Sequence, residues 1–220
     1  MKISIKEITP SPTGEEVFIL IKLFDGCNSA TAKGEMASDF FLTLGLPAKL
    51  TGEIEISREK YDEIEYLMKK TDAVKKGISL LSFAPNTRRA LSQKLVMRGI
   101  SREMADDACL YLSECGYINE YEMAVGFISD LANRRLYGRA RIKNELYSKG
   151  FESDAAQNAI DDSDIDFIKI CEKRINQMGG SRIFAERSMR MKSVSSLIRY
   201  GFTTDEIREA LSRIAEEEDC

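Results

Sequence analysis

An internal repeat constrains the fold of this chain more than any other feature of its sequence. At an offset of 51 residues three kinds of position recur: a leucine, a glycine followed by an apolar residue, and an alanine nine residues after that glycine. Glycine just beyond an apolar run is typical of a helix C-terminus, because it adopts a left-handed backbone at little steric cost. The recurring residues are Leu95, Leu146 and Leu197; Gly99, Gly150 and Gly201; Ile100, Phe151 and Phe202; and Ala108, Ala159 and Ala210.

The length of the repeat predicts its content. Roughly 50 residues suit three short helices joined by tight links. A unit of this size cannot bury its apolar face alone, so neighbouring units are expected to stack into an extended body. We therefore predict a mainly α fold, an elongated array of three tandem three-helix repeats at residues 57–118, 119–162 and 163–220. A small α+β domain at residues 1–56 precedes them.

The N-terminal domain is predicted from a different periodicity. Residues 2–6 alternate polar and apolar, residues 17–24 are apolar and end at Asp25-Gly26, and residues 53–56 alternate again. These patterns predict three strands. A short helix is expected at residues 36–44, where Gly45 and Pro47 follow the apolar run.

Capping residues predict where the helices of the repeats begin. Serine, threonine and asparagine accept a backbone N–H of the first turn, and a glutamate three residues on completes a capping box. Such boxes are expected at Asn119 with Glu122 and at Thr203 with Glu206. Gly77 is expected to end or bend the first long helix. The predicted N-caps are Ser57, Thr87, Ser101, Asn119, Ser163 and Thr203.

Positive charge recurs around the second helix of every repeat. It favours a surface that binds a polyanion or an acidic protein. The alternative is a solvated face balanced by acids elsewhere, since 36 acidic residues outnumber 32 basic ones. The candidate binding residues are Arg88, Arg89, Lys94 and Arg98 in the first repeat; Arg134, Arg135, Arg139, Arg141, Lys143 and Lys149 in the second; and Arg190 and Lys192, with Arg187 and Arg199, in the third.

Three other motifs have features of binding sites. Tyr137 and Tyr147 lie among the basic residues and could stack on bases, although such tyrosines more often close the edge of a helical core. The acidic run at residues 161–166 lacks the glycine and the terminal glutamate of a calcium loop, so a helix start is the better interpretation. Residues 30–34 place lysine beside glycine without the order of a phosphate loop, so no nucleotide site is expected.

Composition bears on the class of function. The chain has no histidine, which removes Ser-His-Asp and Cys-His catalysis and histidine-ligated metals. Its five cysteines form no C-x-x-C pair, which favours free thiols in a reducing cytoplasm. No apolar run approaches the ~20 residues of a membrane helix, and residues 1–8 alternate like a strand rather than a signal peptide. We therefore expect a cytoplasmic protein with no membrane segment, histidine-ligated metal or cofactor. An enzyme of this composition would have to use carboxylates or lysine alone.

The chain resembles the RecX family of recombination regulators over residues 78–211. The most specific block is Gly138-x-x-Arg141-Ile142-x-x-Glu145-Leu146-x-x-Lys149-Gly150-Phe151. The resemblance extends to Leu80-Leu81-Ser82-Phe83, to Leu91-x-x-x-Leu95-x-x-x-Gly99-Ile100, to Gly116-Tyr117-Ile118-Asn119 with Ala124, and to Arg199-x-Gly201-Phe202.

This resemblance implies a function. RecX proteins are helical repeats without catalytic activity that bind the RecA recombinase and its filament on DNA, and modulate, usually inhibit, its activity. The same role is expected here, for a monomer that binds RecA. Single- or double-stranded DNA is a further candidate partner, and direct contact with DNA is left open. The alternative is a DNA-binding module that competes for single-stranded DNA without contacting RecA. A third possibility, a metal-dependent enzyme acting on nucleic acid, has only the acidic run at residues 161–166 in its favour.

Overall fold

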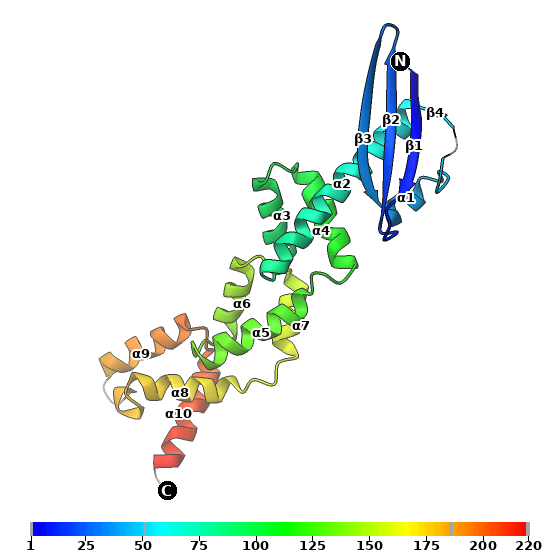
Figure 1. The fold of residues 1–220 in the computed structure, drawn as a ribbon. Coiled ribbons are helices and arrows are strands. Elements are labelled where there is room, and N and C mark those ends of the chain that lie inside the picture. Colours follow the sequence, from blue (N-terminus) through cyan, green and yellow to red (C-terminus); the bar gives the residue numbers. More distant parts are fainter. Residues whose placement is uncertain (1, 51, 185–186, 219–220) are drawn as a thin grey trace. The chain divides into compact units, whose positions relative to one another are not determined.

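The computed structural model describes residues 2–50, 52–184 and 187–218. Its contacts divide the chain into an N-terminal body, Met1–Ala84 with Leu91–Tyr117, and a C-terminal body, Pro85–Ala90 with Ile118–Cys220. The chain is mainly helical with one small antiparallel sheet near its N-terminus, which confirms the predicted fold class (Figure 1). Within the described ranges, no helix combines the length and apolar character needed to cross a membrane.

The sheet belongs to the N-terminal body. It consists of β1 (Lys2–Pro10), β2 (Glu16–Asp25), β3 (Asn28–Ala37) and β4 (Ile54–Ile56), in the order β3-β2-β1-β4. All neighbouring strands are antiparallel. The pairing of β1 with β2 shifts between Ile5 and Glu7. Because one extra residue reverses the alternation of a strand, Ile8 is buried together with Ile3 and Ile5.

Helices α1 (Ser38–Thr43) and α2 (Arg58–Phe83) pack on this sheet. The Thr71 hydroxyl in α2 accepts the N–H of Ala37 at 3.0 Å. Gly34 in β3 leaves space for a methionine of α2, since the Met68 sulfur lies 2.5 Å from where a Cβ of residue 34 would be. The sheet and α2 therefore share one core.

Two predictions for this body are wrong in detail. Met36 ends up buried in β3, so the short helix begins two residues later than expected. Gly77 does not end α2, which continues to Phe83, and a bend there stays a prediction. A Cβ at residue 77 would lie 2.6 Å from Leu112 of helix α4 (Arg102–Glu114), so this glycine serves close helix packing inside α2.

The remaining helices keep the period of the sequence repeat. Helices α4, α7 and α10 begin at intervals of 51 residues, and α6 begins 51 residues after α3. Their bounds, with those of the other elements, are α3 (Arg88–Met97), α4 (Arg102–Glu114), α5 (Glu120–Asn133), α6 (Arg139–Ser148), α7 (Ser153–Asp161), α8 (Phe167–Met178), the 3-10 turn η1 (Ser181–Phe184), α9 (Arg187–Arg199) and α10 (Thr204–Glu218).

The repeated glycines end α3, α6 and α9 in the same way. Gly99, Gly150 and Gly201 have φ of 85°, 84° and 95°. In each case the following apolar residue donates its N–H to the carbonyl of the repeated leucine at 3.2 Å, and the glycine N–H bonds the next carbonyl along. This pair of bonds is the Schellman motif, and it explains the Leu-x-x-x-Gly-apolar pattern.

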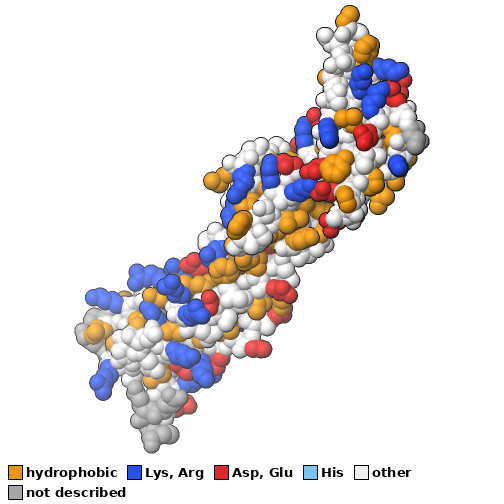
Figure 2. Space-filling model, viewed as in Figure 1, with side chains coloured by type: hydrophobic (Ala, Val, Ile, Leu, Met, Phe, Trp, Pro, Cys, Tyr) orange, Lys and Arg blue, Asp and Glu red, His pale blue; other side chains and the backbone are white. Residues whose placement is uncertain are grey.

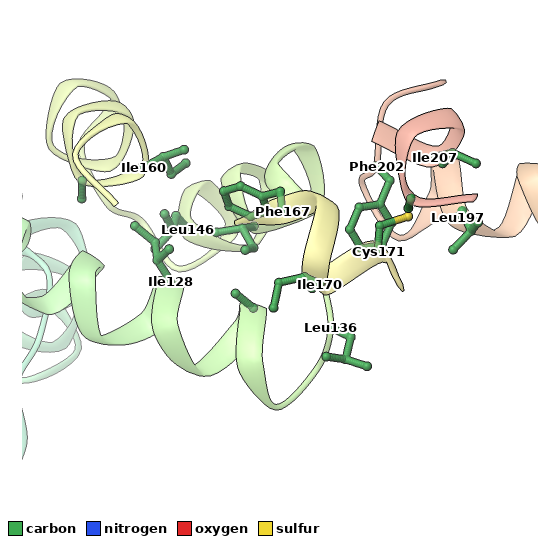
Figure 3. Packing of buried hydrophobic residues seen from close by; sticks show 14 of the residues in the cluster. Ile128, Leu136, Leu146, Ile160, Phe167, Ile170, Cys171, Leu197, Phe202 and Ile207 are labelled. Atoms are coloured by element: carbon green, nitrogen blue, oxygen red, sulfur yellow. The ribbon is translucent and has the colours of Figure 1, made fainter. Parts of the chain in front are cut away.

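The buried residues of the C-terminal body form one cluster that runs through α5 to α10. The repeated Leu146 and Leu197 are fully buried, and Phe151 and Phe202 are nearly so. Figure 3 shows Leu146 beside Ile128 of α5 and Phe167 of α8, with Cys171, Phe202 and Leu197 grouped further along. The repeated positions therefore supply the core.

Most of the predicted N-caps are confirmed. The side chains of Ser57, Thr87, Ser101 and Asn119 each accept a backbone N–H three residues on. Both bonds of the box at Thr203 and Glu206 form, at 3.1 and 2.8 Å.

The predicted cap at Ser163 is wrong. Helix α8 begins after Asp166, whose carboxylate accepts the N–H of Lys169 at 3.0 Å. The Ser163 hydroxyl instead donates to the Ile160 carbonyl at the end of α7.

Candidate partner-binding surface

Helices α9 and α6 meet end to end in the C-terminal body. The N–H groups of Gly138 and Ala140, at the start of α6, donate to the carbonyls of Tyr200 and Gly201, at 2.8 and 3.2 Å. These carbonyls lie at the end of α9, where a helix has acceptors to spare, while the start of a helix has spare donors. The junction therefore satisfies both helix ends at once.

The other end of α6 meets the start of α3 in a similar way. The Thr87 hydroxyl donates to the Lys149 carbonyl at 3.3 Å. The Arg89 side chain lies against Gly150, with its Cδ 3.2 Å from where a Cβ would be. We call α9, α6 and residues 87–90 the basic column, because its parts follow one another head to tail and each carries candidate binding residues.

Glu120 fixes the joint between the end of α6 and residues 87–90. Its two carboxylate oxygens accept the backbone N–H groups of Arg88 and Glu152, both at 2.7 Å. Glu120 is only 9% exposed, and a buried carboxylate requires such partners. The Arg88 side chain adds an ion pair with Glu152. Sequence reasoning missed Glu120, because a glutamate in the first turn of a helix ordinarily signals only a favourable dipole.

Arg139 occupies the position of Arg88 in the next repeat, and it too is held in place. Its guanidinium lies 4.7 Å from the centre of the Phe167 ring. It also lies 3.6 Å from a carboxylate oxygen of Asp161. Phe167 begins α8 as Glu120 begins α5. Each arginine is therefore engaged at the start of its helix, Arg88 by Glu152 and Arg139 by Phe167 and Asp161, with part of each guanidinium still in solvent.

Arg141 and Lys143 are engaged along α6. Arg141 pairs with Glu145 at 3.1 Å and lies 5.1 Å from the Tyr137 ring centre. Lys143 donates to the Gln157 side chain at 2.7 Å and lies 5.7 Å from the Tyr147 ring. The Ser153 hydroxyl, and secondarily the Lys143 ammonium, lower the pKa of Tyr147.

Three further candidates gather where α5 ends. Arg134 pairs with Asp130 at 3.3 Å. Arg134, Arg135 and Lys149 all line one cavity between α5 and α6. Among the described residues, Arg135 has no ion-pair or hydrogen-bond partner.

The candidates of the third repeat are exposed on α9. Arg190, Lys192 and Arg199 are all exposed, whereas the side chain of Arg187 lies outside the described ones. Lysine and arginine side chains gather over α9 and the neighbouring end of α6 on the face shown in Figure 2. Lys94 and Arg98 belong to the N-terminal body, half-buried and exposed respectively. That all these charges form one stripe stays a prediction.

The two tyrosines among these charges close the edge of the core. Tyr137 and Tyr147 are both partly buried against the hydrophobic cluster, and Tyr137 makes an edge contact with Tyr200 at 5.8 Å. This arrangement favours the interpretation that the two tyrosines are core residues over the interpretation that they stack on bases.

The acidic run at residues 161–166 is divided among structural partners. Asp166 caps α8, as described above, and Asp162 accepts the Tyr121 hydroxyl at 3.0 Å, which raises the pKa of Tyr121. Asp161 accepts the Gln157 amide at 2.8 Å. The run thus joins α7 to α8, as the interpretation as a helix start predicts.

Comparison with known proteins identifies similar chains. No family model matches the sequence. The chain is 29% identical to a regulatory protein RecX of Stenotrophomonas maltophilia strain R551-3 over 137 residues, which span 62% of this chain and 83% of the relative. It is 27% identical to regulatory proteins RecX of Halorhodospira halophila, over 65% of this chain and 88% of that one, and of Vibrio cholerae, over 61% and 88%.

Solved structures share the fold. A crystal structure of regulatory protein RecX superposes with a TM-score of 0.66 at 16% identity, over 94% of this chain and 99% of the other. A RecX from Lactobacillus salivarius gives a TM-score of 0.58 at 21% identity, over 67% and 97%. Over 61–65% of its length the chain is thus similar in sequence to proteins named regulatory protein RecX, and it shares the fold of two solved RecX structures.

Proposed function

We propose that this chain is a non-enzymatic regulator that binds the RecA recombinase and its filament on DNA, and lowers the recombinase and ATPase activities of that filament. Its likeness to proteins named regulatory protein RecX supports the regulatory role. The choice of RecA as partner rests on the family resemblance given above. We propose the cytoplasm as its location, where the free cysteines Cys27, Cys109, Cys115 and Cys171 would stay reduced.

The observation that carries the proposal is the basic column. Head-to-tail helices hold cationic side chains at a repeated spacing, and a repeated surface suits a repeated partner such as a filament. Exposed arginines and lysines would steer the encounter and contribute contacts that weaken with salt. The proposed binding residues are Arg88, Arg89, Lys94, Arg98, Arg134, Arg135, Arg139, Arg141, Lys143, Lys149, Arg190 and Lys192.

ATP hydrolysis by RecA on single-stranded DNA tests the proposal. We expect the rate to fall when this protein is added in stoichiometric amount. Replacing Arg135, Arg139 and Arg141 by alanine should weaken the effect, whereas replacing Arg58, Lys60 and Lys69 of α2 removes equal charge and should leave it. An unchanged ATPase rate at stoichiometric wild-type protein would refute the role.

Competition for DNA is the second candidate, favoured by the same exposed cations. A DNA shift assay at several salt concentrations measures direct DNA binding. A pull-down with DNA-free RecA measures contact with the recombinase. Strong DNA binding without any RecA pull-down would favour the competitor over the filament regulator.

A further inference from the structure

A cavity of about 480 Å³ lies between the second half of α5, the link that follows it and α6. This volume is within the range of sites that hold small ligands or anchor side chains. The walls combine apolar side chains with charges of both signs. The lining residues are Phe127, Asp130, Leu131, Arg134, Arg135, Tyr137, Glu145 and Lys149.

The charges of the cavity leave two cations without a carboxylate. Asp130 pairs with Arg134 at 3.3 Å, and Glu145 pairs with Arg141 at 3.1 Å. Across the described part of the chain, neither Arg135 nor Lys149 forms an ion pair. A ligand that brings a negative charge would therefore complete the site.

The aromatic walls of the cavity argue against a nucleic-acid base. Stacking a base needs an open ring face. Lys149 covers the Phe127 ring at 4.8 Å, and Arg141 covers that of Tyr137 at 5.1 Å. Edge contacts with Phe151 and Tyr200 occupy the two rings further.

The carboxylates in the wall argue against a phosphate backbone. Asp130 and Glu145 line the cavity beside the cations. A polyphosphate chain would bring several negative charges to a wall that already carries two, whereas one side-chain carboxylate brings a single charge.

The link between α5 and α6 holds the walls in a fixed conformation. Leu136 has a φ of 52° and is only 5% exposed. A bulky residue rarely adopts this left-handed backbone unless its surroundings impose it. The neighbouring N–H of Tyr137 donates to the Leu131 carbonyl at 3.1 Å. Arg135 and Tyr137 therefore flank an anchored residue, which fixes the backbone that carries these two side chains.

We propose that this cavity is an anchor for a protein partner, and that it binds an aspartate or glutamate next to an apolar residue in an exposed segment of that partner. The carboxylate lies between Arg135 and Lys149, and the apolar side chain lies against Leu131 and the edge of Phe127. This proposal depends on the proposed function in one respect only, namely the identity of the protein that supplies the segment.

Peptide titrations of the full chain, followed by NMR amide shifts, test the anchor. The probes are a peptide with Asp-Phe-Glu between glycine and serine residues, its Asn-Phe-Gln counterpart, and oligo(dT). The variants are Arg135→Glu in the cavity and Arg208→Glu on α10, which change charge equally at exposed positions. We expect Arg135→Glu to weaken binding of the acidic peptide at least about tenfold, and Arg208→Glu to change it less than about twofold.

Three outcomes would overturn the proposed anchor: the acidic peptide leaves the amide shifts of the cavity residues unchanged in wild-type protein, the Asn-Phe-Gln peptide binds equally well, or oligo(dT) displaces the peptide from the cavity. Specific peptide binding together with an unchanged RecA ATPase would uphold the anchor and refute the proposed function, so the two are separable.

Discussion

Gly138 lies against the backbone of Gly201. A Cβ on residue 138 would come within 2.4 Å of the carbonyl carbon and oxygen of Gly201. At this point α6 and α9 meet end to end, and the Gly138 N–H bonds the preceding carbonyl, that of Tyr200. The absence of a side chain at residue 138 is therefore what lets these two helices share hydrogen bonds.

Gly138→Ala should destabilise the C-terminal body. The added methyl meets rigid backbone rather than a flexible side chain, and such overpacking costs about 1–3 kcal/mol. Gly126→Ala in the exposed face of α5 is the matched control. No atom lies within 4 Å of its Cβ position, and removing a helical glycine stabilises by roughly 0.5–1 kcal/mol. Urea unfolding of both variants measures the difference, and an equal effect of the two would contradict the end-to-end packing.

Glu120→Ala should lower the free energy of unfolding more than substitutions of neighbouring surface residues do. It leaves the N–H groups of Arg88 and Glu152 without their acceptor, and hydrogen bonds to a charged group contribute about 1.5–3 kcal/mol each. We expect a loss of at least about 2 kcal/mol in thermal or urea unfolding. Glu122→Ala, an exposed change two residues on, should cost less than about 1 kcal/mol. A loss no larger than that of the control would show that Glu120 does not support the joint.

Asp166→Ala should reduce stability in a pH-dependent way. The Lys169 N–H holds the folded pKa of Asp166 below its usual value, and Arg213 acts in the same direction. A depressed carboxyl pKa stabilises the fold above the unfolded pKa of about 3.9, and this contribution is lost as the pH falls through the folded pKa. The free energy of unfolding of the variant should be about 1 kcal/mol lower than that of the wild type at neutral pH. This difference should disappear below about pH 4. Asp164→Ala, at an exposed position of the same link, should show no such difference.

Thiol labelling should separate the cysteines by position. Burial, and secondarily the nearby Glu206 and Glu172, raises the pKa of Cys171 to about 12. The reactive thiolate is therefore scarce at mildly alkaline pH. Cys27 and Cys115 are exposed, whereas Cys109 and Cys171 are buried. Peptide mapping after iodoacetamide should find Cys27 and Cys115 modified in native protein, and Cys109 and Cys171 only after denaturation. Rapid native labelling of Cys171 would show that the α8–α10 core opens readily.

The sequence predicts the repeats well, because their signal is local. Leu146, Gly150 and Phe151 lie close enough along the chain to define one helix end by themselves. By contrast, β3 escaped prediction because Asn28, Ala30 and Lys33 have little strand propensity. It forms because β2 turns at Gly26-Cys27 and supplies ten residues of antiparallel pairing. Asp166 displaced Ser163 as a cap, since both are good caps and only packing selects one.

The candidate site was predictable in composition and not in detail. The sequence identifies Arg135 and Arg139 equally as basic residues near α6. Only the folded chain distinguishes them, because Phe167 and Asp161 engage Arg139 while Arg135 stays open in the wall of a cavity. Glu120 has no distinguishing sequence signal, since its partners come from residues 88 and 152, each 32 positions away.

The end-to-end joints at both termini of α6 fix the number of residues that this helix can have. One inserted residue would rotate everything beyond it by roughly 100° and lengthen the path by about 1.5 Å, so Gly138 and Gly150 could not both keep their partners. Insertions and deletions in related chains should therefore accumulate in the segments before α5 and α8, because the spacing between the starts of α2, α5 and α8 already varies along this chain. They should spare the ten residues of α6, Arg139–Ser148.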